Sequence, residues 1–235
     1  MINQNYYCML DFETDSVNPL TTNPIQIGSI IINPFKLEII EGSEFSSWVK
    51  PDCEINQEYY QKNKDTLDFH CRNQNISIDQ LLEKIKSSPP EKVVWDQYKE
   101  YLKKYHTRAN NQNMFSAPIL CAYNLHKFDE KILQRLCEKY KCINKEGTQN
   151  LFHPRDKIDI LELVFMWFQF MNEPPNYTMD TLRDFFGLSQ EGSHDAASDV
   201  LQEAAILCKF LKLHHNLAHK IQFKGSFLNE KNKIM

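Results

Sequence analysis

The chain has 235 residues, 42% of them hydrophobic and 25% charged, with a formal net charge of −4. This length suits one domain with a substantial core and requires no second domain. The negative charge argues against a surface that binds a polyanion over its whole extent. The six glycines form neither a G-x-G-x-x-G fingerprint nor a Walker loop, which argues against nucleotide-cofactor binding by those routes.

Cysteine usage and the apolar runs indicate the cellular compartment. The seven cysteines are scattered, without a C-x-x-C pair or nearby Cys/His ligand spacing, so the sequence indicates neither a disulfide framework nor a zinc site. The start MINQNYYCML does not read as a signal peptide, and the longest apolar run, residues 163–171, is too short to cross a bilayer. We therefore expect a soluble, cytoplasmic protein with no membrane contact.

The first half of the chain reads as strands followed by helices. Three stretches closed by Pro, Asn or Asp predict an antiparallel meander, at residues 6–10, 25–32 and 45–50. Ser77 and Gln80 form a capping box, and Pro90 opens a helix that extends to residue 105. One face of that helix is apolar and aromatic: Val94, Tyr98, Tyr101, Leu102 and Tyr105.

The second half combines one strand with helices. The apolar run 117–123 is typical of a buried strand, and the helical pattern KFDEKILQRLCEKY follows it. Further helices are predicted at residues 161–171, 178–186 and 195–213. The inward face of the last one is predicted to hold Val200, Leu201, Ala204, Ala205, Leu207, Cys208 and Leu211. These elements predict an α/β fold, a mixed sheet of three antiparallel strands plus parallel strands, flanked by helices.

Two carboxylates at the end of the first strand raise the question of function. Asp11 and Glu13 alternate with Phe12, so both acids point to one face while Phe12 enters the core. Adjacent anions repel unless a cation lies between them, which predicts a divalent metal site. Asp52 and Glu54 have the same spacing but follow a proline instead of a buried strand. A strand end capped by two solvated acids stays open as the alternative for Asp11 and Glu13.

Two later segments add further polar groups. In AYNLHKFDEKIL, Asn124 follows the strand, and Asp129 lies in the first turn of a helix, where an acid by itself more often caps than catalyses. In EGSHDAASDVLQEAA, His194 precedes a helix and Asp199 follows five residues later. Of the eight histidines, only His194 has an aspartate at that distance.

Taken together and in this order, DFET, NLHKFD and HDAASD resemble the motifs of the DEDDh (DnaQ-like) 3′-to-5′ exonuclease superfamily, over about residues 5–212. The runs YNLHKFDEKI, KIDILELV and SHDAASDV look most similar to the catalytic half of bacterial exonuclease I. One departure concerns Asn124 and Asp129, which four residues separate where many family members have three. The longer spacing leaves the role of Asn124 less certain than that of Asp129.

The resemblance implies a ribonuclease-H-like fold and a two-metal phosphodiester hydrolysis. Asp11, Glu13, Asp129 and Asp199 would hold two Mg²⁺ or Mn²⁺ ions, which activate the attacking water and stabilise the leaving 3′ oxygen. His194 would take the proton of that water as general base. Thr14, Asn124 and Lys127 are candidate substrate-binding residues. The products would be nucleoside 5′-monophosphates.

Substrate and partners are less sharply defined. The resemblance implies binding of the 3′ end of a single strand, with DNA favoured; the alternatives are an exoribonuclease similar to oligoribonuclease or ribonuclease T, and a polymerase-associated proofreading subunit. A nuclease-fold binding module without activity is disfavoured because all five motif residues are present. We expect the exonuclease domain at residues 1–213 and a basic tail at 214–235 that is a candidate contact for a polymerase or another replication or repair protein.

Overall fold

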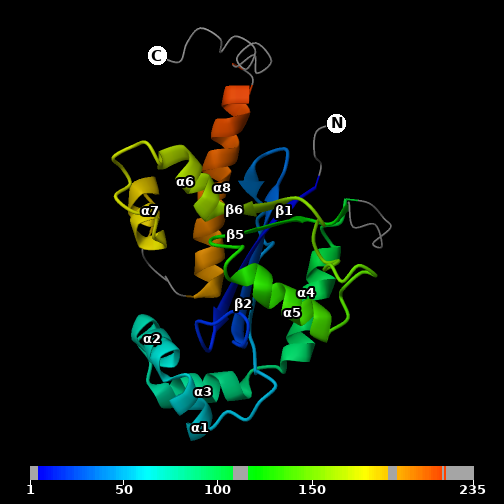
Figure 1. Ribbon diagram of the computed structural model, residues 1–235, viewed down its shortest axis with the longest axis vertical. Coiled ribbons are helices and arrows are strands. Elements are labelled where there is room, and N and C mark those ends of the chain that lie inside the picture. Colours follow the sequence, from blue (N-terminus) through cyan, green and yellow to red (C-terminus); the bar gives the residue numbers. More distant parts are fainter. Residues whose placement is uncertain (1–4, 108–115, 190–194, 219, 221–235) are drawn as a thin grey trace.

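The computed structural model describes residues 5–107, 116–189, 195–218 and 220, and a mixed β-sheet organises this part of the chain (Figure 1). The strand order is β3-β2-β1-β5-β6, and β4 pairs with another part of β2. The strands are β1 (Tyr7–Thr14), β2 (Pro24–Asn33), β3 (Glu38–Ile39), β4 (Phe45–Trp48), β5 (Ile119–Ala122) and β6 (Lys157–Asp159).

The pairing confirms the predicted fold class. β2 runs antiparallel to β1, β3 and β4, whereas β5 runs parallel to both β1 and β6. The sequence did not predict β3 and β6, because strands of two and three residues are too short to show alternation. β1 is longer than the predicted strand and continues through Asp11 and Glu13, so both acids belong to the sheet.

Eight helices accompany the sheet in the described part of the chain. They are α1 (Gln57–Lys62), α2 (Lys64–Gln74), α3 (Ile78–Ser87), α4 (Glu91–Lys103), α5 (Asp129–Lys139), α6 (Ile160–Phe168), α7 (Met179–Phe186) and α8 (Ala196–Ala218). The predicted capping box of Ser77 and Gln80 begins α3, and Gly187, with a φ of 67°, ends α7. The sequence did not predict α1 and α2. In α2 only Leu67 and His70 are buried, so it lacks an apolar stripe.

Side-chain alternation along β1 separates two cores on opposite faces of the sheet. Cys8, Leu10 and Phe12 pack with α4 and α5, whereas Met9 packs with α6, α7 and α8. Asp11 and Glu13 have the parity of Met9 and therefore point to the α8 face; the sequence predicted that the two acids share a face opposite Phe12. A third apolar cluster, around Ile25 and Leu67, joins α1, α2 and α3 into a lobe at one end of the sheet (Figure 1).

Helix α8 packs across β1 and β2 and differs from its prediction in two respects. It continues to Ala218, five residues beyond the predicted end at residue 213. The inward position of Leu201 was predicted wrongly, because Leu201 is 45% exposed and polar side chains, Gln202 and Glu203, are buried next to it. An apolar pattern cannot identify an inward face that is partly polar. Within the described residues, none of the helices combines the length and apolar character needed to cross a membrane.

The first turn of α8 approaches the sheet closely at Gly28. Gly28 is the β2 partner of Asp11, and a Cβ at this position would lie 2.2 Å from the carbonyl oxygen of Ala196. Only glycine allows this contact, since real side chains never approach a backbone atom so closely. The contact holds the start of α8 directly above Asp11.

The Gly28→Ala substitution therefore tests whether this approach determines the position of α8. We expect it to lower the free energy of unfolding by roughly 1–3 kcal/mol or more, because overpacking displaces the helix. Gly147→Ala is the control: Gly147 has a φ of 79° but nothing within 4 Å of its added Cβ, so it reports backbone strain alone. Urea denaturation of both variants provides the measurement. A smaller loss for Gly28→Ala than for Gly147→Ala would contradict the packing argument.

Candidate functional site

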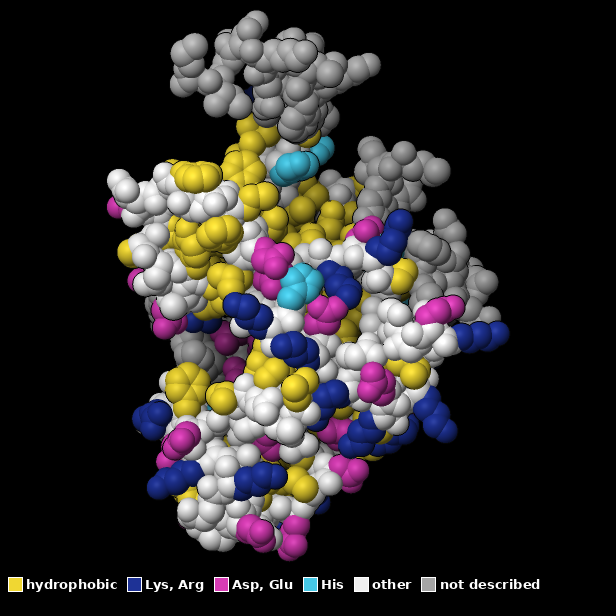
Figure 2. Space-filling model, viewed as in Figure 1, with side chains coloured by type: hydrophobic (Ala, Val, Ile, Leu, Met, Phe, Trp, Pro, Cys, Tyr) yellow, Lys and Arg dark blue, Asp and Glu magenta, His cyan; other side chains and the backbone are white. Residues whose placement is uncertain are grey.

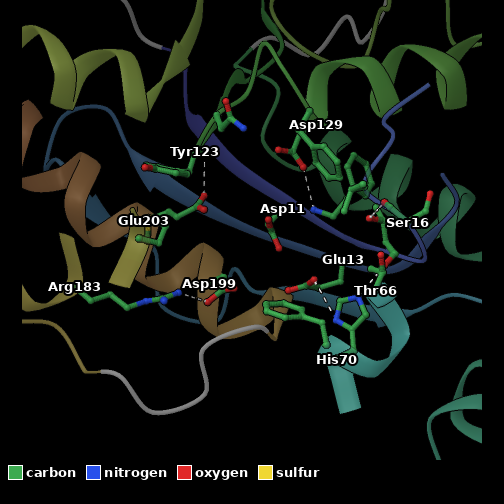
Figure 3. Close-up of a pocket in the computed structure, with 17 residues that line it drawn as sticks. Asp11, Glu13, Ser16, Thr66, His70, Tyr123, Asp129, Arg183, Asp199 and Glu203 are labelled. Atoms are coloured by element: carbon green, nitrogen blue, oxygen red, sulfur yellow. Dashed lines mark hydrogen bonds and ion pairs between the residues drawn. The ribbon is translucent and has the colours of Figure 1, made fainter. Parts of the chain in front are cut away.

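A pocket of about 460 Å³ opens at the end of β1, where α2, α5, α7 and α8 converge (Figure 3). Its volume falls in the range of small-molecule sites. The acidic side chains that line it are Asp11, Glu13, Asp129, Asp199 and Glu203. Figure 2 shows acidic side chains in the recess between α7 and α2.

The structure brings the four predicted acids to this one pocket from three segments of the chain. Asp11, Glu13 and Asp199 each offer an oxygen that lies within 4.8 Å of the other two. Asp129, 3% exposed, is anchored separately, since its Oδ1 accepts a hydrogen bond from the Phe12 amide at 3.2 Å. By contrast, Asp52 and Glu54, which share the spacing of Asp11 and Glu13, are both exposed.

Local sequence explains how α8 and α5 deliver their acids. Gln26, the β2 partner of Glu13, donates a hydrogen bond from Nε2 to Oδ1 of Asp195 at 2.8 Å, which ties the residue before α8 to the sheet. Asn124, with a φ of 57°, makes the left-handed turn after β5, and its carbonyl accepts the amides of Lys127 and Phe128. This turn places Asp129 as the first residue of α5, beside β1.

Burial and mutual repulsion raise the pKa values of these acids. Burial, followed by the charges of Asp199 and Asp195, raises the pKa of Glu13 to about 7. Burial raises the pKa of Asp129 to about 8, although backbone hydrogen bonds oppose the shift. Burial, then Glu13 and the other three acids of the pocket, raises the pKa of Asp11 well above its usual range. The site therefore carries more negative charge than the protein alone neutralises.

Arg183 on α7 is a buried cation at this site, at 1% exposure. Its Nη2 donates to Oδ1 of Asp199 at 2.6 Å and its Nη1 to Oδ1 of Asp180 at 2.7 Å. Its Nε donates to Oε1 of Gln202. The guanidinium thereby fixes the orientation of Asp199, while Asp11 and Glu13 receive no comparable ion pair from it.

His70 on α2 connects the α1–α3 lobe to the end of β1. Its Nε2 lies 2.8 Å from the carbonyl oxygen of Thr14, and its Nδ1 lies 3.7 Å from Oε2 of Glu13 (Figure 3). His70 is 2% exposed, so its imidazole is buried between α2 and the end of β1. The imidazole therefore positions both Glu13 and the backbone that follows it.

The other predicted site residues occupy different surroundings. Thr14 and Asn124 line the pocket, and the Thr14 hydroxyl donates to the carbonyl of Ser16 at 2.8 Å. Lys127 is exposed and is not among the lining residues. His194 lies outside the described residues. The functional roles of Thr14, Asn124, Lys127 and His194 stay predictions.

The sequence itself matches an exonuclease family model, RNase_T, over residues 8–207. The chain belongs to this exonuclease family. The matched range contains all three acidic segments, and the match confirms the resemblance indicated by their motifs. No curated protein matches the sequence.

Solved structures of nucleases share the fold of this family member. Cell-death related nuclease 4 superposes with a TM-score of 0.63 at 16% identity, over 90% of this chain and 65% of its own. Exonuclease I of E. coli, in complex with a 5cy-dT13 oligonucleotide, gives 0.60 at 17% identity, over 93% of this chain and 46% of its own.

A third structure, a 3′-exonuclease with specific recognition of the histone mRNA stem-loop, gives a TM-score of 0.56 at 14% identity, over 88% of this chain and 82% of its own. At such identities the likeness shows the fold, and the predicted ribonuclease-H-like class is confirmed. The chain spans less than two thirds of cell-death related nuclease 4 and about half of exonuclease I.

Among the charged and imidazole side chains that line the exonuclease pocket, sequence reasoning missed three: His70, Arg183 and Glu203. A signal existed for two of them. Glu203 follows Asp199 by one helical turn, and Arg183 occupies the apolar face of α7 between Met179 and Phe186. His70 gave no signal, because α2 has no apolar periodicity and its contact with Thr14 depends on the fold.

The residues of the pocket suit the divalent ions that the family implies. Oδ2 of Asp11 is buried and has no hydrogen-bond partner within the described part of the chain, although a buried carboxylate oxygen normally has one. Carboxylate oxygens are the ligands that Mg²⁺ and Mn²⁺ prefer. The orphaned oxygen and the close trio of Asp11, Glu13 and Asp199 therefore fit a hard cation.

The raised pKa values predict how the metal-free exonuclease responds to pH. Glu13 and Asp129 bind protons more tightly in the folded state than in the unfolded chain, so their contribution is full below about pH 4 and is lost as pH rises through 7 to 8. With a chelator present, we expect stability to fall between pH 6 and 8.5, by ~1.4 kcal/mol for each pKa unit crossed.

Thermal unfolding at both pH values measures this loss. Added Mg²⁺ should raise the melting temperature more at pH 8.5 than at pH 6, because the cation competes with protons for the same oxygens. The double substitution Glu13→Gln with Asp129→Asn is the control and should flatten the pH dependence. A metal-free wild type that grows more stable towards pH 8.5 would contradict the electrostatic account.

Proposed function

We propose that the protein is a metal-dependent 3′-to-5′ exonuclease that hydrolyses the terminal phosphodiester of single-stranded nucleic acid, with DNA favoured. The products are nucleoside 5′-monophosphates. The observation that carries this proposal is the convergence of Asp11, Glu13, Asp129 and Asp199 on one pocket in a chain of the exonuclease family. The three segments that supply the acids are the three that the motifs identify.

In the proposed mechanism these four acids would hold two divalent cations, Mg²⁺ or Mn²⁺. When bound, the cations supply charge stabilisation for an in-line displacement at phosphorus. Arg183 orients Asp199 and His70 positions Glu13, so two of the acids are fixed before substrate arrives. His194 accepts the proton of the attacking water. Thr14, which lines the pocket, contacts the terminal nucleotide.

Proteins that share this fold support a nucleic-acid substrate, which is either DNA or RNA. Exonuclease I has been solved in complex with a dT13 oligonucleotide, and the 3′-exonuclease recognises the histone mRNA stem-loop, so both DNA and RNA are bound by proteins of this fold. A single strand suits the pocket, because the terminal base must leave its stack to bring the last phosphate to the acids. Exoribonuclease activity is the second candidate, and parallel DNA and RNA digestions decide between them.

A protein partner and a cellular location complete the proposed function. The basic tail at residues 214–235, most of which lies outside the described residues, is the proposed contact for a polymerase or another replication or repair protein. All seven cysteines are free, in keeping with a reducing compartment such as the cytoplasm.

Digestion of a 5′-labelled single-stranded oligonucleotide tests the proposed activity. With Mg²⁺ the wild type should produce a ladder that shortens from the 3′ end. Asp11→Asn should reduce the rate by about a hundredfold or more, the order that a preorganised electrostatic group contributes. Asp52→Asn is the matched control, since it changes an exposed acid of the same D-x-E spacing and should leave the rate unchanged. Equal rates for Asp11→Asn and the wild type would refute the proposal.

The His194→Ala substitution tests the general base separately. We expect kcat to fall by roughly 10²–10⁴-fold, while Mn²⁺ affinity is retained because the carboxylates are intact. Added imidazole should restore part of the rate by accepting the proton in place of the side chain. Kinetics with and without imidazole, together with a Mn²⁺ titration, provide the measurement. Full activity of His194→Ala would assign the proton transfer to another group.

A further inference from the structure

The pocket holds a fifth carboxylate outside the three motifs. Glu203 lies on α8 one turn after Asp199, so both side chains project from the same face of the helix. Glu203 is 4% exposed and lines the pocket together with Asp11 and Asp129 (Figure 3). A glutamate buried this deeply normally has a cationic partner.

No such partner is found among the residues that the structure describes. Oε2 of Glu203 accepts a hydrogen bond from the Tyr123 amide at 3.3 Å, at the end of β5. Arg183 is the nearby buried cation, but its Nη2, Nη1 and Nε donate to Asp199, Asp180 and Gln202 respectively. Glu203 therefore makes no ion pair within the described part of the chain. Burial and the charges of Asp129 and Asp199 raise its pKa well above the usual range, although the charge of Arg183 lowers it.

The arrangement of the other acids indicates where a cation would balance this charge. Asp11, Glu13 and Asp199 form a trio whose oxygens lie within 4.8 Å of one another, whereas Asp129 stands outside it. A second ion beside Asp129 would have Asp11 as its only other ligand from the motifs. Glu203 also lines the pocket outside this trio, and Asp11 lies between it and Glu13 (Figure 3).

We propose that Glu203 is a further metal-binding residue of the active site, which supplies a carboxylate oxygen to the divalent cation held beside Asp129 and Asp11. This inference rests on the proposed function, because it assumes that the pocket binds two cations. The Tyr123 amide would orient the Glu203 carboxylate, much as the Phe12 amide orients Asp129. The fifth acid would allow the chain to retain its second cation at lower metal concentration than four acids alone.

Glu203→Gln is the test variant, because glutamine keeps the side-chain volume and an acceptor for the Tyr123 amide but removes the charge. Mn²⁺ titrations by calorimetry and electron paramagnetic resonance, without substrate, measure binding directly. We expect the wild type to bind two ions and Glu203→Gln to keep the tighter one while its second dissociation constant rises at least about tenfold. Glu83→Gln on the exposed face of α3 is the control and should bind Mn²⁺ as the wild type does.

Thermal unfolding of the same proteins separates a metal-binding role of Glu203 from a structural one, because the two roles predict opposite changes in the metal-free melting temperature. Without metal, Glu203→Gln should melt at a higher temperature than the wild type, because one repelling charge is gone. With Mn²⁺, its stabilisation should be smaller than that of the wild type. A purely structural Glu203 predicts a lower metal-free melting temperature and an unchanged gain from Mn²⁺, which would overturn the proposal.

A variant that does not fold and a wild type that binds no metal would each have a distinct consequence. If Glu203→Gln does not fold, Glu203→Asp replaces it: the shortened carboxylate should weaken the second ion at least threefold, and unchanged binding would overturn the proposal. If the wild type and Glu203→Gln bind two ions with the same affinities, only the proposed role of Glu203 is refuted, and the proposed function stands. A wild type that binds no Mn²⁺ refutes the proposed function itself.

Discussion

The electrostatic repulsion among buried carboxylates at the end of β1 is the constraint on which the rest of this structure depends. Asp11, Glu13, Asp129, Asp199 and Glu203 line one pocket, and the described part of the chain places Arg183 as a buried cation among them. Left alone, such charges would separate or remain protonated. The surrounding elements must therefore supply enough packing and hydrogen bonding to hold them together.

Three features of the fold supply this restraint. β2 pairs with β1 along its whole length, and β5 pairs with Tyr7–Met9, so the strand is held on both sides just before Asp11. Gly28 lets the first turn of α8 lie directly on the sheet, which brings Asp199 to Asp11. The α1–α3 lobe sends His70 to Thr14 and Glu13 from the other side. Each restraint uses buried apolar surface elsewhere to offset the repulsion at the site.

Sequence reasoning correctly placed those site residues whose position follows from the periodicity of one strand or helix. The alternation of Asp11, Phe12 and Glu13 predicted their opposite faces, and the strand before Asn124 and the helix after it predicted where Asp129 would lie. It missed residues that reach the site only through tertiary contacts. Helix α2 has no apolar stripe, so neither the helix nor His70 was predicted, and the inward face of α8 was misassigned at Leu201 because acidic and amide side chains replace part of its apolar stripe.

The polar stripe of α8 shows how stability and function compete within one element. Val200, Ala204 and Leu207 secure the helix to the sheet, while Asp199, Gln202 and Glu203 use neighbouring inward positions that apolar side chains would otherwise fill. Replacing Asp199 and Glu203 with leucine would bury more apolar surface and remove the repulsion, yet it would also remove two carboxylates that line the pocket. The same clustered carboxylates that destabilise the metal-free fold by repelling one another would attract a cation placed between them. The energetic cost of the site and its chemistry therefore have a single origin. We therefore expect a chain that folds this way to be more stable with a divalent cation bound than without one.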